Sequence, residues 1–233
     1  MIGDLIEGFK NKLDDNISKS IKENDKKLSE ISLNIEVIEE ITSHISSDTQ
    51  IILKEIIHDL ISGLYSGLQA LYRNAYISLR SGIELSLAYV YFLDHNYEYL
   101  FWKQDKYDVR WSVLENEEMG VLNKKYLALF CNDEFENLFN LCRKIYRDCS
   151  QFVHGKYEYM YTVKHQVIDY DKNTLIEFLN MFYDLTNVVI ALLLIRHSNL
   201  NLGIDETYKG IIEKNLKKLQ LTNTLEKVKG YWK

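Results

Sequence analysis

The sequence contains no proline and only ten glycines in 233 residues. At average usage, a chain of this length would hold roughly a dozen prolines. Proline and glycine are the residues that most often interrupt helices and shape tight turns, so their scarcity favours long helices over many short strands. An apolar fraction of 46% is sufficient for a substantial core. We therefore expect an all-α protein.

Apolar residues recur at intervals of three and four along most of the chain, which is the spacing of one helix face. The pattern predicts a single domain over residues 1–233. It has an N-terminal helical arm or hairpin over 1–46, a four-helix-bundle core over 50–200, and short lysine-rich helices over 205–233. The four core helices are expected near residues 52–71, 74–93, 133–155 and 173–197.

Two stretches depart from this spacing. The segment 95–133 is rich in aromatic residues and is interpreted as an insertion of short helices. Its tryptophans, Trp102 and Trp111, are better explained as core of the insertion than as a platform for nucleic-acid bases. Residues 156–171, KYEYMYTVKHQVIDYD, place Tyr157 and its second neighbours on one side, which predicts an extended or β-like excursion.

Local signals refine the helix ends and contacts. The polar break SSDTQ offers Ser47 and Asp48 as N-caps for the first core helix. Arg80 and Glu84 are four residues apart on the second core helix, so they are candidates for an internal ion pair. Gly155 would end the third core helix.

Charge places limits on the partners. The formal net charge of −6 argues against a general polyanion binder, so any nucleic-acid site must be a local basic patch. Residues 208–233 hold seven lysines against two glutamates, a local balance of +5. A solvated helix face is the favoured explanation of this segment, and a nucleic-acid footprint is the alternative.

Cysteine usage and apolar runs indicate the compartment. Cys131, Cys142 and Cys149 have no metal-site spacing, and their odd number indicates the reducing cytoplasm. Cys142 and Cys149 are seven residues apart, at helical spacing, and are expected to be packing residues. The N-terminus has no signal-peptide apolar region. The longest apolar run, residues 188–195, is much shorter than the ~20 residues of a membrane span. It is expected to be a buried helix, and no membrane partner is expected.

Several catalytic motifs are absent from the sequence. It contains no GxGxxG or GKT/GKS phosphate-binding loop and no GxSxG nucleophile motif. No HxxxH or Cys/His grouping suggests zinc, so neither a metal nor a cofactor is expected.

The stretch RDCSQFVHG, residues 147–155, lies at the end of the third predicted core helix. Arg147 and His154 are seven residues apart, which is ~20° short of two full turns and a rise of ~10.5 Å. Both side chains would therefore face the same way. Ser150 and Gln151 lie between them on that face, and Asp148 lies one step around it.

These residue types suit phosphate chemistry. The planar arginine fork matches phosphate oxygens, and histidine can take and give a proton near neutral pH. Together they supply the minimum for cleaving RNA without a metal. A base removes the proton from a 2′-OH, which attacks the adjacent phosphorus while a cation stabilises the growing charge. By spacing alone, an ordinary polar helix end is the commoner explanation.

The motif resembles the signature of the HEPN superfamily of small four-helix domains. That signature is an arginine, a polar residue, three to five further residues and a histidine, matched here by Arg147, Asp148, CSQFV and His154. The helix LRSGIELSLAYVYF, residues 79–92, resembles the second core helix of such domains. The resemblance covers roughly residues 50–200 and leaves the arm, the insertion and the tail outside it.

The resemblance implies a metal-independent endoribonuclease of a toxin, abortive-infection or other antiviral system. Such proteins usually form homodimers in which two copies of the motif line one cleft, and an antitoxin or a defence-system protein can be a further partner. One toxin branch has a modifiable tyrosine two residues after its histidine. Here Tyr157 follows His154 by three residues, which weakens that inference.

Two other interpretations remain open. A minority of the superfamily is non-catalytic and binds nucleotides or partner proteins, and a helical structural protein without a site is the third alternative.

Beside the motif, Lys156 and Tyr157 would contact RNA, since bases stack on aromatic rings next to cations. For the tyrosines after His154, a half-buried strand face is the simpler explanation.

Overall fold

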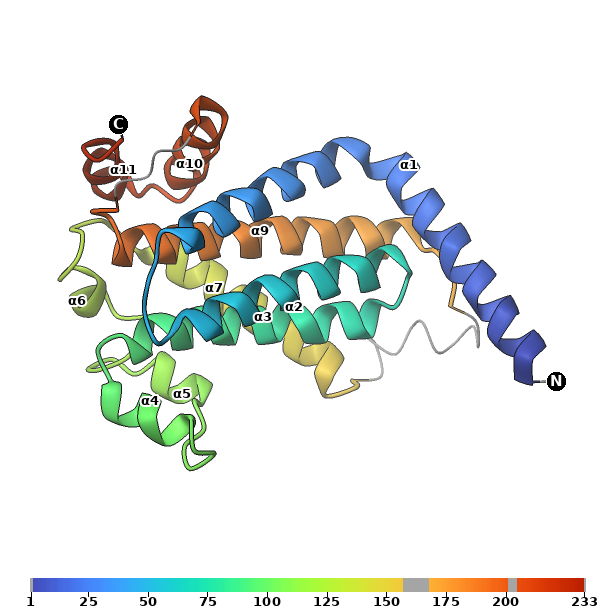
Figure 1. The fold of residues 1–233 in the computed structure, drawn as a ribbon, viewed down its shortest axis with the longest axis horizontal. Helices are drawn as coiled ribbons and strands as arrows, with labels where there is room; N and C mark the ends of the chain where they lie inside the picture. Colours follow the sequence, from blue (N-terminus) through green and yellow to red (C-terminus); the bar gives the residue numbers. More distant parts are fainter. Residues whose placement is uncertain (1, 157–167, 201–204, 233) are drawn as a thin grey trace.

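The protein is represented by a computed structural model that describes residues 2–156, 168–200 and 205–232. Regular secondary structure within these ranges is entirely helical, so the all-α prediction is confirmed (Figure 1). Most of the predicted extended stretch after Lys156, including Tyr157, lies outside the described residues. The helices are α1 (Ile2–Ser43), α2 (Gln50–Leu68), α3 (Tyr72–Phe92), α4 (Asn96–Trp102), α5 (Trp111–Leu114), α6 (Lys124–Leu127), α7 (Glu136–Val153), α9 (Lys172–Arg196), α10 (Glu206–Lys218) and α11 (Thr222–Lys229).

Helices α3 and α9 form the centre of the molecule. Helix α3 packs against α2, α7 and α9, and α9 also packs against α1 (Figure 1). Every residue of α9 from Leu185 to Ile195 is buried, as expected for a helix that is apolar on nearly all sides. Among the described helices, α9 is the one whose length and composition would allow it to cross a membrane, but 83% of its most apolar window is buried inside the protein.

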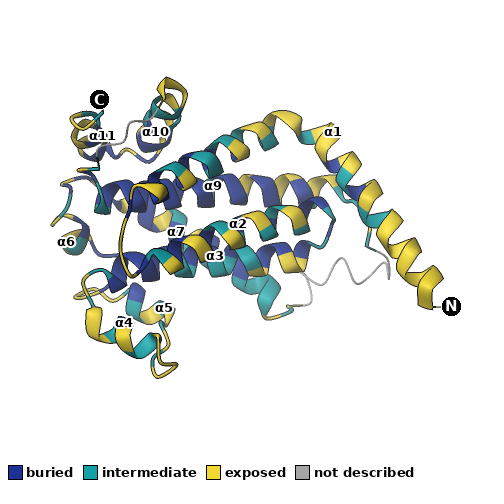
Figure 2. Ribbon diagram, viewed as in Figure 1, coloured by how far each residue is buried: buried dark blue, intermediate teal, exposed yellow. Residues whose placement is uncertain are grey.

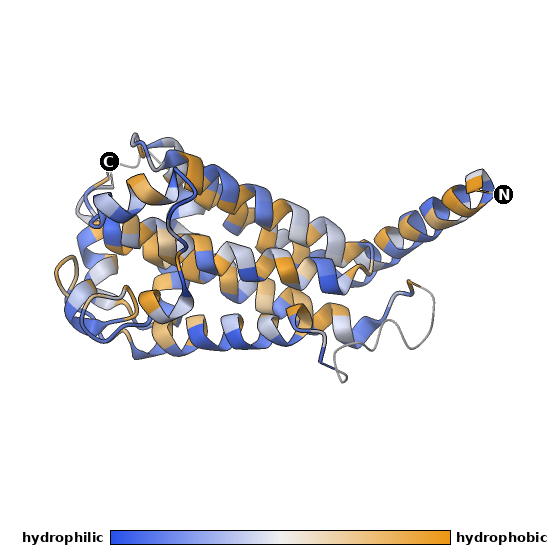
Figure 3. Cartoon of the chain, turned by 90° about the horizontal axis from the view of Figure 1, so that it is seen from below, coloured by the Kyte–Doolittle hydropathy of each residue, from blue (hydrophilic) through white to orange (hydrophobic). Residues whose placement is uncertain are grey.

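Helix α1 consists of two parts that differ in burial. Its backbone leaves helical geometry at Asn24, where φ is −130° and ψ is 20°, so the segment is one kinked helix and not a hairpin. The outer part projects from the body and is largely exposed, with apolar residues along its length (Figures 2 and 3). The inner part packs against α9 and α2, and Ile31, Ile38 and Ile41 belong to the core.

Glycine allows α2 to approach its neighbours closely. A Cβ on Gly67 would overlap the ring of Phe178 on α9, and a Cβ on Gly63 would lie 3.1 Å from the Cβ of Ser78 on α3. Real Cβ atoms do not tolerate the first of these contacts, so a glycine is required where α2 crosses α9.

A buried polar cluster joins the N-terminal and C-terminal helices. The amide of Asn34 on α1 donates to Thr186 Oγ1 at 2.8 Å and to Asn187 Oδ1 at 3.1 Å, both on α9. Asn215 on α10 donates to Asn34 Oδ1 at 3.2 Å. Because buried polar groups must find partners, these bonds specify how α1, α9 and α10 fit together.

Two local predictions concern the start of α2 and an ion pair on α3. The N-cap prediction is wrong, because the residue before α2 is Thr49 and it makes no side-chain capping bond. The turn is closed by the backbone, where the Gln50 N–H donates to the Ser47 carbonyl at 3.0 Å. The Arg80–Glu84 ion pair is confirmed at 3.5 Å.

Candidate functional site

Helix α7 carries the predicted motif, and its two faces differ sharply. Leu138, Ile145, Cys142 and Cys149 are buried on the face toward α3 and α9. The prediction that these two cysteines are packing residues is therefore confirmed. Burial raises the pKa of the Cys142 thiol to about 12 and raises that of Cys149 as well, so neither supplies a thiolate nucleophile near neutral pH.

The opposite face of α7 is exposed and carries the predicted pair. The Arg147 side chain is 67% exposed, and its Nε–H donates to Asp148 Oδ1 at 3.3 Å. His154, two turns further along, is also exposed. We call the exposed face from Asn140 to His154 the α7 ridge. Because its side chain is mostly exposed, the guanidinium of Arg147 is accessible to a phosphate in solution.

The end of α7 holds His154 in a defined backbone position. Gly155 has a φ of +58°, the left-handed conformation that glycine adopts without strain. The Gly155 N–H donates to the Phe152 carbonyl at 3.2 Å, and the Lys156 N–H donates to the Gln151 carbonyl at 3.3 Å. These two bonds define a Schellman motif, in which His154 is the C-cap residue. The expectation that Gly155 ends this helix is confirmed.

The supporting residues predicted from the sequence bond mainly to the helix itself. The Ser150 hydroxyl donates to the Tyr146 carbonyl at 2.6 Å, and the Gln151 amide donates to the Arg147 carbonyl at 3.2 Å. Lys156 is exposed just beyond the helix, and Tyr157 lies outside the described residues. Ser150 and Gln151 therefore each donate a hydrogen bond back to the helix that carries the ridge.

A second arginine joins the site from a distant part of the sequence. Arg73, at the start of α3, is exposed and donates from Nη2 to the Val153 carbonyl at 3.3 Å. The bond satisfies one of the free carbonyls at the C-terminus of α7. It also brings a second guanidinium to the turn that carries His154. Because the donor and the acceptor are 80 positions apart in the sequence, no local sequence pattern could have indicated this contact.

Beneath the ridge, aromatic and charged side chains attach the insertion to α7. Arg80 donates to the Tyr146 hydroxyl at 3.2 Å, and Trp111 stacks on the Tyr146 ring with centroids 3.8 Å apart. The Trp111 indole and the Arg143 guanidinium both donate to Glu115, at 2.9 and 2.7 Å. Trp111 is therefore engaged in packing, in agreement with its interpretation as core of the insertion.

A cleft of about 350 Å³ lies beside the ridge, between α7 and α9. Its lining includes the carboxylates of Asp148, Glu177 and Asp184 against the single cation of Lys144. Two of these carboxylates have cationic partners outside the lining, because Asp148 pairs with Arg147 and Asp184 pairs with Lys218.

The lysines of the C-terminal segment are largely paired with carboxylates. These ion pairs favour the solvated helix face over a nucleic-acid footprint, because a paired lysine has less charge to offer a phosphate. The pairs are Lys209–Glu206 at 2.8 Å, Lys214–Glu30 at 3.1 Å, Lys217–Glu213 at 2.6 Å, Lys218–Asp184 at 2.8 Å and Lys229–Glu213 at 3.2 Å.

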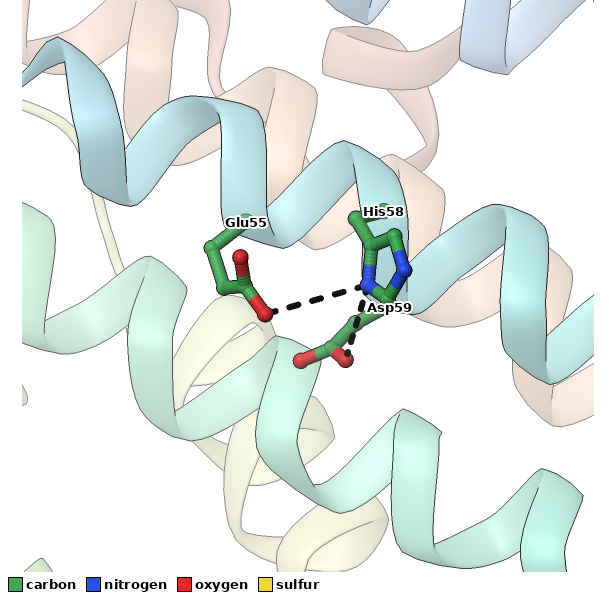
Figure 4. Close-up of side chains that lie close together, drawn as sticks. All are labelled: Glu55, His58 and Asp59. Carbon is green, nitrogen blue, oxygen red and sulfur yellow. Dashed lines mark ion pairs between the residues drawn. The ribbon is translucent and has the colours of Figure 1, made fainter.

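Possible metal ligands come together at one place in the described part of the chain, away from the ridge. Glu55, His58 and Asp59 project from α2 toward one another (Figure 4). The motif residues of α7 do not belong to this group.

Comparisons with models of protein families, with curated proteins and with solved structures found no match for this chain.

Proposed function

We propose that the protein is a metal-independent endoribonuclease of HEPN type that acts in a toxin or abortive-infection-like defence system in the cytoplasm. The proposal depends on one observation. Arg147 and His154 stand on the same exposed ridge of α7, two turns apart, within a sequence pattern that resembles the HEPN signature.

The chemistry needs only these two side chains and the RNA. His154 removes the proton from a ribose 2′-OH, and the 2′ oxygen attacks the adjacent phosphorus. The bond from phosphorus to the 5′ oxygen breaks, and that oxygen takes up a proton. The products are a 2′,3′-cyclic phosphate and a 5′-OH end. Arg147 binds the non-bridging phosphate oxygens and stabilises the charge that grows on them.

The separation of the two side chains calls for a second copy of the chain. Two helical turns place Arg147 and His154 ~10.5 Å apart along α7, which is too far for both to reach one phosphate directly. If two ridges meet around a two-fold axis, Arg147 of one copy can lie beside His154 of the other. We therefore propose a homodimer with two composite sites.

Cleavage of a defined RNA tests the proposal. Wild type in EDTA should cleave it and leave 2′,3′-cyclic phosphate ends, and a 2′-deoxy substitution at the cut should block the reaction. His154→Ala should lower the rate by ~10²–10⁴-fold, the usual contribution of a proton-transfer residue. Asp148→Asn should lower it less.

Asn140→Ala is the matched control, since Asn140 is exposed on the same ridge two turns before Arg147. Its rate should equal that of wild type. Cleavage that survives His154→Ala, or that requires a metal, would refute the assignment.

A second candidate function has its own observation. Ile2, Leu5 and Phe9, on the outer part of α1, have 76%, 72% and 47% of their surface exposed. Exposed apolar side chains in a row often mark a binding surface. We infer that a non-catalytic interaction or nucleotide-binding module of a larger defence assembly is the alternative. Intact RNA together with capture of a defence-system protein through residues 1–46 would favour it.

A further inference from the structure

Three potential metal ligands converge on the exposed side of α2. Glu55, His58 and Asp59 occupy positions i, i+3 and i+4, so their side chains share one face of the helix. His58 Nδ1 lies 3.7 Å from Glu55 Oε1 and 4.0 Å from Asp59 Oδ1, and one ligand atom of each residue lies within 4.8 Å of the other two (Figure 4).

These separations are close to those of a bound metal. Bonds of ~2.0–2.2 Å from zinc to nitrogen and oxygen place neighbouring ligand atoms about 3–3.5 Å apart. The Glu55 and His58 side chains are 60% and 69% exposed, so they can rotate by the small amount required.

Asp59 is the least exposed of the three side chains, and its Oδ1 lies 4.0 Å from His58 Nδ1. Its side chain is 15% exposed, and its Oδ2 is closed to solvent without a well-formed hydrogen bond to any described residue. The Ser81 hydroxyl on α3 lies near this carboxylate. Among the described residues, its ion-pair partner is His58. A carboxylate held in this way gains from a nearby positive charge.

The structure contains an internal comparison for this group. His44 and Glu40 on α1 also lie at i and i+4, with His44 Nε2 3.1 Å from Glu40 Oε1 and side chains 35% and 36% exposed. That pair belongs to no group of three ligands in the described part of the chain. The pair on α1 therefore offers a histidine and one carboxylate without a third ligand, whereas the group on α2 offers a histidine and two carboxylates.

We propose that Glu55, His58 and Asp59 form a binding site for a divalent transition metal, with zinc as the preferred ion among the common ones. One imidazole and two carboxylates suit zinc, cobalt and nickel, whereas calcium and magnesium require more oxygen ligands. Three protein ligands leave at least one coordination position for water. The site is separate from the α7 ridge, so it does not depend on the proposed ribonuclease.

Titration of the tag-free, full-length protein with cobalt(II) and zinc tests this proposal. Bound metals are first removed from the protein with EDTA, and the EDTA is then removed by dialysis. Cobalt(II) should produce visible absorption bands that saturate at one ion per chain, and zinc should displace it. His58→Ala and Asp59→Asn should each weaken zinc binding by at least ~10-fold. His44→Ala should bind as wild type does.

Circular dichroism of each variant distinguishes a lost ligand from a lost fold. Because the His58 side chain is exposed, His58→Ala should keep the wild-type fold. Wild type that binds no cobalt, or His58→Ala that binds as tightly as wild type, would overturn the proposal. RNA cleavage is not part of the readout, so failure here leaves the ribonuclease assignment untouched.

Discussion

Helices α7 and α9 pack against each other but use their surfaces in opposite ways. Helix α9 is buried without a gap from Leu185 to Ile195, so almost every substitution there meets the core. Helix α7 buries one apolar face and leaves Arg147 and His154 exposed on the other. A helix with one exposed face can therefore change its surface chemistry without changing the fold. The proposed function therefore depends on α7, and the stability of the core depends on α9.

The largest expected effect on stability comes from α9. Phe182 is fully buried, and Phe182→Ala should lower the free energy of unfolding by ~3–5 kcal/mol, because it leaves a cavity in the core. Urea denaturation followed by circular dichroism measures this change. Arg147→Ala on the ridge is the paired variant and should change stability by less than about 0.5 kcal/mol. Equal losses in the two variants would remove the distinction between the helices.

Acid should act through the end of α9. His197 lies within 2.7 Å of the Tyr89 hydroxyl, and burial, together with the charge of Arg196, lowers the His197 pKa to about 4. The folded state holds His197 neutral where the unfolded chain would protonate it. The resulting stability is complete above pH 6.5 and is lost as the pH falls toward 4, by at most ~3 kcal/mol.

The measurement is the free energy of unfolding at several pH values in that window, for wild type and His197→Gln. The variant should show a shallower decline with falling pH, because it has lost the titrating group. Parallel curves would mean that other groups cause the loss of stability in acid.

The contact of α2 with α9 should tolerate no added methyl group. Gly67→Ala should cost ~1–3 kcal/mol, because the new Cβ overlaps Phe178 and both helices must shift. Gly8→Ala is its control, since a Cβ at Gly8 meets no atom within 4 Å. Thermal denaturation of the two variants compares them, and a stable Gly67→Ala protein would show that the interface adapts.

A substitution at the end of the α7 ridge should cost less stability than one at the contact of α2 with α9. Gly155→Ala should cost about 1 kcal/mol, because alanine strains at a φ of +58°. Cleavage of RNA should fall with it if the Schellman motif positions His154. Gly210→Ala, in an open and exposed position of α10, is the control and should be neutral or slightly stabilising. An unchanged Gly155→Ala protein would show that the turn relaxes freely.

Much of the helical architecture followed from spacing and from single residues. The apolar period predicted α2, α3, α7 and α9 to within a few residues. The spacing of opposite charges predicted the Arg80–Glu84 pair, and the glycine at position 155 predicted the end of α7. These features are local, so the sequence around them contains the necessary information. The N-cap prediction for α2 was wrong because a backbone turn, and not a polar side chain, closes the start of this helix.

The features that could not be predicted depend on contacts between distant residues. Asn34 is polar yet buried, because its partners arrive from α9 and α10. Arg73 reaches the end of α7 across 80 residues of sequence. The ligand group on α2 was missed for a different reason, since a search for HxxxH and Cys/His spacing passes over a histidine flanked by two carboxylates.

A mixing experiment tests the composite site most directly. Arg147→Ala and His154→Ala are prepared separately, mixed under conditions that exchange subunits, and assayed on RNA beside wild type. In a mixed dimer, the intact His154 of one copy meets the intact Arg147 of the other, so two inactive proteins should regain about a quarter of the wild-type rate. A mixture that stays inactive while wild type cleaves RNA and subunit exchange is verified would contradict the composite dimer site.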